Sequence, residues 1–369
     1  MGGRIVLLTP GPVEVDQRVL KAMARPPVSH RSPEFSELLE RIIERLRDVY
    51  GARGPVVVMP GGGTAAVDAM VHTFIGRGSR VLVASAGEFG DRMAETAKRT
   101  GALVDVLSFN WGDPVDASRL LEVVESTRYD ALLLVHNETS TGMLQHNLEA
   151  IARRLCGMID LVLVDAVSSL AATELKLEEW CIDAIASASH KAIGSVPGVA
   201  FVAVGEDSIA KARGSPALNL DLRTYIRFYA EKRQTPYTPP VNALYALDEA
   251  LGIIFEHGIE AWIREYRSRA SAVYGEALKR GIEPLVREEA FRSTTVAVFK
   301  VPPGVDAGSV AGKLAEKGFL VGKGMGKLKK STVRIGLMGA VTIRDLVEAV
   351  RSMDELIQYL SEKPPAPQQ

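Results

Sequence analysis

One lysine lies among small residues, where an amine could do chemistry. The segment DAIASASHKAIGSVPG (183–198) runs through small apolar residues and serines to Lys191, then breaks into glycine and proline. A lysine between a strand and such a turn lies at the rim of a sheet, where open α/β sheets bind ligands. A partly dry pocket lowers the proton affinity of the amine and makes it nucleophilic, as Schiff-base chemistry requires. The alternative is an ordinary surface lysine.

A carboxylate precedes this lysine at the end of another apolar run. Asp165 closes the segment LVLVD, far enough before Lys191 for one helical crossover between neighbouring strands. A carboxylate at the end of a buried strand is costly unless it meets a positive partner. It could keep a pyridinium nitrogen protonated, or it could cap a helix or a turn. Val167 could pack against a flat ring or belong to the core.

A glycine-rich turn could hold a phosphate. PGGGTAA (60–66) follows a strand and opens a helix. The amides of Gly62, Gly63 and Thr64 at a helix N-terminus would form a phosphate cradle. The segment matches neither GxxxxGK[ST] nor GxGxxG, which argues against nucleoside triphosphates and dinucleotides. A simple tight turn is the alternative.

Three more side chains could contribute to the same binding site. Thr139 in HNETSTG could bond a phenolic oxygen or cap a helix, and Phe89 in AGEFGDR could stack on a ring or pack a loop. Arg334 lies inside the apolar segment TVRIGL, where a guanidinium needs a carboxylate ligand or a structural salt bridge. Together, an amine, a ring acid, a phosphate cradle, a stacking aromatic and a carboxylate anchor are what pyridoxal 5′-phosphate needs.

Apolar runs alternate with helical patterns through the first two thirds of the chain. Continuous runs such as LLLV and LVLVD suit a sheet buried on both faces, and their alternation with helices predicts a mostly parallel, doubly wound α/β sheet. The expected strands are 56–59, 80–84, 103–109, 131–136, 161–165, 183–189 and 199–204. The expected helices between and before them are 34–50, 64–75, 89–100, 117–126 and 147–156.

After about Pro240 the pattern changes to long helices and short strands, which predicts a smaller α+β domain. We expect helices at 241–257, 259–280, 310–317 and 343–360, and strands at 293–301, 319–324 and 332–337. The domain limits that follow are an extended N-terminal arm (1–13), a large domain (14–257), a small domain (258–362) and a disordered tail (363–369).

Composition excludes several classes of protein. The 369 residues carry a net charge of −1, so the protein has no overall positive charge that would favour binding to nucleic acid or to a membrane surface. No apolar run approaches the length of a membrane span. Cys156 and Cys181 form no disulfide framework and fit a reducing compartment. We expect a cytoplasmic protein without a metal site.

The motifs, in their order and spacing, closely resemble the class V aminotransferases of fold type I, in particular the alanine–glyoxylate / serine–pyruvate aminotransferase group. The resemblance covers nearly the whole chain. It rests on TPGP (9–12), HRSPEF (30–35), GGGTAA (61–66), GEFGDR (87–92), HNETSTG (136–142), VDAVSS (164–169), SASHKA (187–192), TPYTPP (235–240), GKGMGKLKK (322–330) and RIGLMG (334–339).

The resemblance implies a seven-stranded large domain, pyridoxal 5′-phosphate and a homodimer with active sites at the interface. It assigns the aldehyde linkage and proton transfer to Lys191 and the ring nitrogen to Asp165. The further roles that it implies are Val167 and Phe89 on the two ring faces, Gly62, Gly63 and Thr64 around the phosphate, Thr139 near the ring oxygen, Thr235 and Thr238 at the partner's phosphate, Arg334 at the substrate carboxylate and Gly11 at the entrance. His190, where some members have glutamine, is a further cofactor-binding residue to which the resemblance gives no specific role.

We therefore expect a ping-pong transamination from alanine or serine to glyoxylate or pyruvate. Aspartate, 2-aminoethylphosphonate or ureidoglycine as donor are alternatives within the same family. A cysteine desulfurase or lyase needs a mobile cysteine, usually late in the chain, and both cysteines here precede Lys191. A nucleotide-binding regulatory or structural protein with an α/β core is the alternative from a different class, and its preparations would be colourless.

Overall fold

Short, uninterrupted apolar runs form the central sheet of the computed structural model, which describes residues 4–362. Across the sheet, the seven strands are β2 (Val56–Gly61), β10 (Gly198–Val204), β9 (Ala184–Ala188), β8 (Leu161–Asp165), β5 (Ala131–Val135), β3 (Arg80–Ser85) and β4 (Leu103–Ser108). Only β10 runs antiparallel to its neighbours, and the others pair in parallel. The predicted fold class, a mostly parallel seven-stranded sheet, is confirmed.

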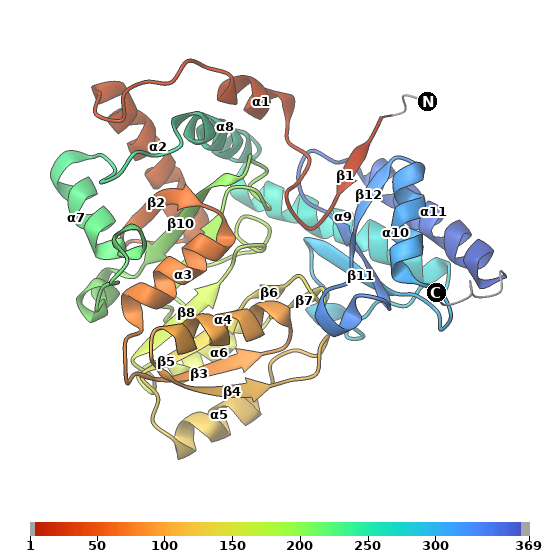
Figure 1. The fold of residues 1–369 in the computed structure, drawn as a ribbon, viewed down its shortest axis with the longest axis horizontal. Helices are drawn as coiled ribbons and strands as arrows, with labels where there is room; N and C mark the ends of the chain where they lie inside the picture. The colour runs from red at the N-terminus through yellow and green to blue at the C-terminus, as the bar shows by residue number, and fades with distance from the viewer. Residues whose placement is uncertain (1–3, 363–369) are drawn as a thin grey trace.

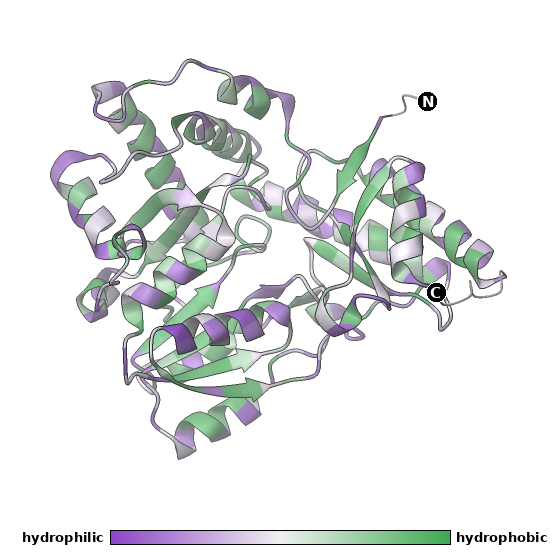
Figure 2. Ribbon diagram, viewed as in Figure 1, coloured by the Kyte–Doolittle hydropathy of each residue, from purple (hydrophilic) through white to green (hydrophobic). Residues whose placement is uncertain are grey.

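Helices cover both faces of this sheet (Figure 1). On one face lie α2 (Pro33–Tyr50), α5 (Ala117–Ser126), α6 (Leu148–Leu155) and α8 (Val241–His257), and on the other lie α3 (Gly63–Phe74), α4 (Glu88–Arg99) and α7 (Leu222–Lys232). Successive side chains of a strand point to opposite faces, so Leu132 and Leu134 belong to one core while Ala131 and Leu133 belong to the other. Two buried cores explain why most of the strand residues are apolar and green in Figure 2, whereas the edge strand β4 is exposed or half-buried and contains Asp105.

A second, four-stranded sheet forms the smaller part of the molecule (Figure 1). Its strands, in order, are β1 (Val6–Leu8), β12 (Phe319–Lys323), β13 (Thr332–Gly336) and β11 (Val296–Lys300). The helices packed against it are α9 (Ile259–Lys279), α10 (Ala307–Glu316) and α11 (Ile343–Ser361). Helices α8 and α9 meet at Gly258, which has a φ of 82°. The domain limits in the sequence analysis stay a prediction, and its tail (363–369) lies outside the described residues.

The N-terminal arm is extended, as predicted, and part of it joins the small sheet. Strand β1 pairs in parallel with β12, Val6 opposite Phe319. The arm then passes three glycines of the small sheet and its following loop: a Cβ on Gly336, Gly322 or Gly339 would collide with Thr9, Pro10 or Glu14 respectively. These glycines let the arm pass close to the sheet.

Three short elements were not anticipated. They are α1 (Gln17–Met23) and the paired strands β6 (Asn137–Glu138) and β7 (Met143–Leu144); the longer α7 was also missed. Helix α1 packs on α8, so a contact distant in sequence stabilises a segment too short to be a helix alone. Among residues 4–362, no helix is both long and apolar enough to cross a membrane.

The two cysteines form a disulfide bond, contrary to the expectation that they form no such framework. Cys156 follows α6 and Cys181 precedes β9. Both segments flank the start of β8, which brings the two thiols together although they are 25 residues apart in sequence. The bond closes a loop that contains β8 and Asp165.

Reduction of this disulfide is expected to lower the stability of the fold. Opening a loop of this length removes about 3 kcal/mol, because the cross-link limits the entropy of the unfolded chain. Thermal unfolding with and without a strong thiol reductant measures the effect. The Cys156→Ser/Cys181→Ser variant is the control: it should unfold at the temperature of the reduced wild type and ignore the reductant. An equal response of both proteins to reductant would contradict the prediction.

Candidate active site

The parallel strands bring Asp165 and Lys191 to the same edge of the sheet. Asp165 is the last residue of β8 and lies opposite Ala186 of β9, and Lys191 follows three residues after β9 ends. Both line a cavity of about 180 Å³. The other residues that line it are Gly63, Thr64, Val67, Asp68, Phe89, Arg92, Met93, Thr96, Asn137, Thr139, Val167, Ser168 and His190.

Asp165 is a buried carboxylate that faces this cavity. Its side chain is 6% exposed, and Oδ1 accepts a hydrogen bond from the Val167 amide at 2.8 Å. Burial raises the pKa of Asp165 to about 6, although that hydrogen bond and the positive charges of Lys191 and Arg92 act in the opposite direction. A positive charge in the cavity next to this carboxylate would therefore be stabilised.

Lys191 lies between the cavity and the N-terminal arm. Its Nζ donates a hydrogen bond to the carbonyl of Pro10 at 2.5 Å, and a Cβ on Gly11 would collide with the same amine. Burial and, secondarily, the positive charge of Arg334 lower the pKa of Lys191 to about 8, while Asp165 raises it. An amine with this pKa is partly deprotonated near neutral pH and can act as nucleophile and base.

The N-terminus of α3 forms the cradle expected from the sequence. Its N-cap is Gly62, and no side chain accepts a hydrogen bond from the first turn. A Cβ on Gly63 would approach Val167 Cγ1 to 2.5 Å, so only glycine lets this turn pack against Val167. The amides of Gly63 and Thr64 and the helix dipole favour an anion here.

His190 lies beside the same cradle, where its Cε1 is 3.4 Å from the place that a Cβ on Gly62 would take. Its buried Nδ1 has no hydrogen-bond partner. Burial lowers the pKa of His190 to about 4, helped by the charge of Lys191. A neutral ring with one unpaired nitrogen suits an incoming oxygen ligand, because a buried polar atom without a partner is costly.

Two more predicted residues enter the cavity from different elements. Phe89 lies in the first turn of α4, and Thr139, which is 3% exposed, follows β6. Arg92, one turn after Phe89, stacks its guanidinium 4.8 Å from the Phe89 ring centre. Arg92 was not predicted as a site residue, although its spacing from Phe89 places both on one face of a helix.

Arg334 reaches the site from β13 of the small sheet. Its Nε donates to the carbonyl of Lys323 at 2.7 Å, and its Nη1 donates to the carbonyl of Thr139 at 3.3 Å. Among residues 4–362 it forms no ion pair. Burial lowers the pKa of Arg334 to about 10, and the charge of Glu138 opposes this shift. An unpaired, partly buried guanidinium is a site for an anionic ligand.

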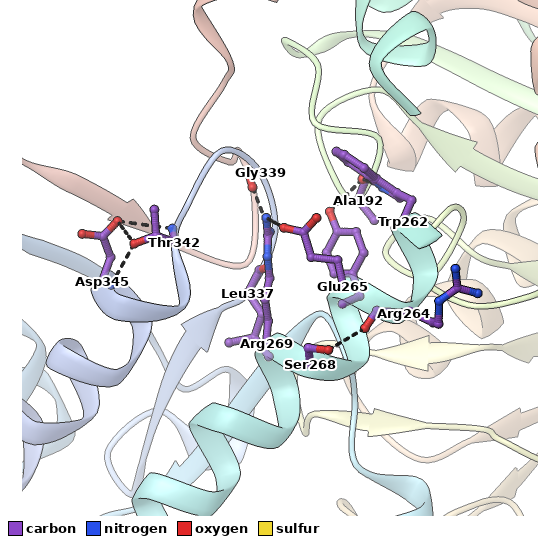
Figure 3. A network of polar contacts seen from close by, with 11 residues as sticks. Ala192, Trp262, Arg264, Glu265, Ser268, Arg269, Leu337, Gly339, Thr342 and Asp345 are labelled. Carbon is purple, nitrogen blue, oxygen red and sulfur yellow. Dashed lines mark hydrogen bonds and ion pairs between the residues drawn. The ribbon is translucent and has the colours of Figure 1, made fainter. Parts of the chain in front are cut away.

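Helix α9 connects the segment after Lys191 with the segment after Arg334 (Figure 3). Trp262 Nε1 and Tyr266 Oη donate hydrogen bonds to the carbonyl of Ala192 at 3.4 and 2.8 Å. Arg269 Nη1 donates to the carbonyls of Leu337 and Gly339 at 3.1 and 2.9 Å. The helix thereby fixes the amine and the guanidinium relative to each other.

Five predicted residues do not line this cavity: Gly11, Gly62, Arg334, Thr235 and Thr238. The first three lie beside residues of the site, and the last two do not. Thr235 is 3% exposed and its hydroxyl donates to the carbonyl of Tyr237 at 2.8 Å, while Thr238 is exposed. Their assigned role at a partner's cofactor stays a prediction. Residues that line the cavity and were not anticipated include Asp68, Asn137 and Ser168. Ser168 directly follows the predicted Val167, and Asn137 lies two residues before the predicted Thr139, so their positions just after strand ends were the signal that could have found them.

A seven-stranded sheet, an amine and a carboxylate at its carboxyl edge, and a helix N-terminus without a side-chain cap define a fold type I transferase site. The aminotransferase class-V family profile matches residues 8–348, and the chain belongs to this family. The fit of the site to pyridoxal 5′-phosphate agrees with this membership, because the unpartnered His190 nitrogen, the Gly63 turn and the buried Asp165 match a phosphate and a ring nitrogen. The protein is a pyridoxal 5′-phosphate-dependent aminotransferase.

Related proteins and solved structures match this chain over nearly its full length. The chain is 34% identical to an uncharacterised aminotransferase of Methanocaldococcus jannaschii, over 96% of this chain and 93% of that one. It is 29% identical to the serine–glyoxylate aminotransferase of Methylorubrum extorquens, over 94% and 90%. The structure of an alanine–glyoxylate aminotransferase from Nostoc matches with a TM-score of 0.92 and 31% identity, over 97% and 96%. Other relatives are named for ureidoglycine or aspartate as the amino donor.

Proposed function

We propose that this aminotransferase moves the amino group of alanine or serine to glyoxylate or pyruvate, in the cytoplasm and as a homodimer. The observation that carries the proposal is the unpaired Arg334 guanidinium, whose charge acts on the Lys191 amine. A cation next to the reactive amine suits a substrate whose carboxylate is one carbon from its amino group. Pro10 and Gly11 lie against Lys191 and leave little room for a long side chain.

When bound, pyridoxal 5′-phosphate would supply the aldehyde carbon that takes up the amino group and the ring that withdraws electrons from the substrate. We assign the chain's own groups as follows. Lys191 Nζ would hold the cofactor aldehyde and later move the substrate proton, and Asp165 would keep the ring nitrogen positively charged. The surrounding assignments are Phe89 and Val167 against the ring faces, Gly62, Gly63, Thr64 and His190 at the phosphate, Thr139 near the ring oxygen, Gly11 at the entrance, and Thr235 and Thr238 at the partner's cofactor.

Lys191 performs these tasks from one position. Its hydrogen bond to the Pro10 carbonyl places the amine, and its lowered pKa of about 8 leaves part of it free to accept a proton. Arg334 holds the substrate carboxylate with its guanidinium, which orients the bond that is broken. Phe89 and the arm restrict the access of water to the same place.

A panel of amino acids tests the choice of donor. Alanine, serine, aspartate, ureidoglycine and 2-aminoethylphosphonate are each added to the holoenzyme, and the absorbance change of the bound cofactor is followed in a single half-reaction. We expect alanine and serine to react fastest, and glyoxylate or pyruvate to reverse the change. Aspartate as the fastest donor would contradict the proposal, since it would require a second carboxylate site.

Cysteine desulfuration is disfavoured as a rival activity. It needs a mobile thiol, whereas both cysteines are joined in the disulfide at the far edge of the sheet from Asp165 and Lys191. A preparation that releases sulfide from cysteine at the rate of transamination would reverse this conclusion.

Replacement of Arg334 with alanine is expected to raise KM for the amino acid by about 30-fold, because about 2 kcal/mol is lost with a hydrogen bond to a charged group. The effect on kcat should be smaller, since the guanidinium does not touch the transferred proton. Initial rates over a range of amino acid concentrations separate the two constants. The matched control is Arg351→Ala, on the surface of the small domain, which should leave KM unchanged. An unchanged KM in Arg334→Ala would assign this residue a structural role.

A further inference from the structure

Glu138 is a buried carboxylate next to the site that none of the assigned roles uses. It is 1% exposed and lies on β6, directly before Thr139. Its Oε2 accepts hydrogen bonds from the amides of Phe89 and Gly90 at 3.0 and 3.2 Å. Its Oε1 accepts from the amide and the hydroxyl of Ser140 at 3.1 and 2.5 Å. Burial raises the pKa of Glu138 to about 7, while the Ser140 hydroxyl and the amides of Ser140 and Gly90 act in the opposite direction and favour the ionised form.

Helix α4 depends on this carboxylate for its N-terminal cap. Its own N-cap residue is Gly87, which has no side chain to accept the free amides of the first turn. A Cβ on Gly87 would approach Glu138 Cγ and Cδ to 2.5 Å, so glycine leaves the space that the carboxylate fills. The Ser140 hydroxyl accepts from the Glu88 amide at 3.1 Å and completes the cap. A negative charge at this helix end is also favoured by the helix dipole.

The same residue acts on the small domain. Arg334 Nη1 donates a hydrogen bond to the carbonyl of Thr139, the residue after Glu138. The negative charge of Glu138 raises the pKa of Arg334 and so opposes the effect of burial on that guanidinium. Glu138 is thus linked to two residues of the site, to Phe89 through the Phe89 amide and to Arg334 through the carbonyl of the neighbouring Thr139.

We propose that Glu138 is a positioning residue of the active site: its carboxylate fixes the first turn of α4, and with it Phe89, and its hydrogen bonds to Ser140 fix the turn whose Thr139 carbonyl accepts from Arg334. The inference rests on the roles proposed above for Phe89 and Arg334. It predicts that loss of this carboxylate weakens two affinities that are measured separately: the affinity for the cofactor, through Phe89, and the affinity for the substrate, through Arg334.

Glu138→Gln tests the proposal because glutamine keeps the shape and removes the charge. Its amide nitrogen would face a donor of Ser140, or its single oxygen would have to serve all the amides. We expect the dissociation constant of pyridoxal 5′-phosphate and the KM for alanine both to rise about tenfold, the size of one charged hydrogen bond. Cofactor affinity is measured by titrating the cofactor-free protein and following the quenching of protein fluorescence. The expected change in kcat is smaller, because Glu138 does not contact the reacting atoms.

Asp183→Asn is the matched control. Asp183 is also buried, accepts hydrogen bonds from the Val162 amide, the Ser208 hydroxyl and Lys211, and lies at the opposite edge of the same sheet. Its variant should lose thermal stability while keeping cofactor affinity and KM. If Glu138→Gln loses stability in the same way and retains both affinities, Glu138 is only structural and the proposal is wrong.

Gly87→Ala is the second test, which serves if Glu138→Gln does not fold. The added methyl group would displace the carboxylate without removing it, and both constants should again rise together. Wild-type values in Gly87→Ala would overturn the proposal. The Arg334→Ala experiment separates this inference from the proposed function: if that variant raises KM while the Glu138 and Gly87 variants do not, only the positioning role fails.

Discussion

Replacement of Lys191 with alanine is expected to lower the transamination rate by about 10⁴-fold or more. The reason is that no other amine takes its place: Lys191 is the one lysine that lines the cavity, and the arginine in the same lining, Arg92, carries a guanidinium group and not an amine. The variant should still bind the cofactor through the α3 cradle and Asp165, but without a covalent bond.

Borohydride reduction followed by intact-mass measurement tests whether the cofactor is bound covalently through Lys191. Reduced wild-type enzyme should carry the mass of one covalently bound cofactor, and Lys191→Ala should carry none. Lys176→Ala is the control, because this exposed lysine only pairs with acidic side chains of its own segment. A trapped adduct or retained activity in Lys191→Ala would remove the central residue of the proposed site.

Asp165→Asn is expected to have opposite effects on activity and on the stability of the cofactor-free protein. Activity should fall by about 10²- to 10³-fold, because a neutral amide cannot hold the positive charge on the ring nitrogen. The cofactor-free variant should nevertheless be more stable than wild type at pH 8. Folding raises the pKa of Asp165 from 3.8 to about 6, so the folded state resists ionisation that the unfolded chain accepts.

The gain in stability from Asp165→Asn should appear only at a pH at which Asp165 is ionised in the unfolded chain. Below about pH 4 the carboxyl is protonated in both states, and wild type carries no penalty. Between pH 4 and 6 the unfolded chain loses its proton first, and the folded state is destabilised by up to about 3 kcal/mol above pH 6. Thermal unfolding of both cofactor-free proteins at pH 4 and pH 8 should show the variant gaining only at the higher pH. A gain that is equal at both values would contradict this explanation.

Much of the fold could be predicted because local patterns determine it. All seven strands of the large sheet were predicted within one or two residues, since all but the edge strand β4 are short apolar runs that are mostly buried on both faces. The residues at their carboxyl ends could be combined into one site because parallel strands end at the same edge. Lys191, Asp165, Phe89 and Thr139 do line one cavity.

What the sequence did not reveal depends on contacts between distant segments. The pairing of β1 with β12 and the Cys156–Cys181 bond leave no local signal. Glu138 was hidden for another reason: a glutamate among hydroxyl residues is typical of an exposed loop, and its burial is tolerable only because α4 supplies amides to it. The HNETSTG segment still contained a clue, since it directly follows the continuous apolar run LLLV.

The pairing of β1 with β12 has a consequence for the order in which the protein is made. The strands of the large sheet all lie between Val56 and Val204, so this sheet can assemble before the ribosome has added β12. Strand β1 precedes all of these strands in the chain, yet it waits for a partner that begins at Phe319. The Pro10 carbonyl is therefore brought to the reactive amine late, and a nascent chain completes its active site only after Phe319–Lys323 has been made.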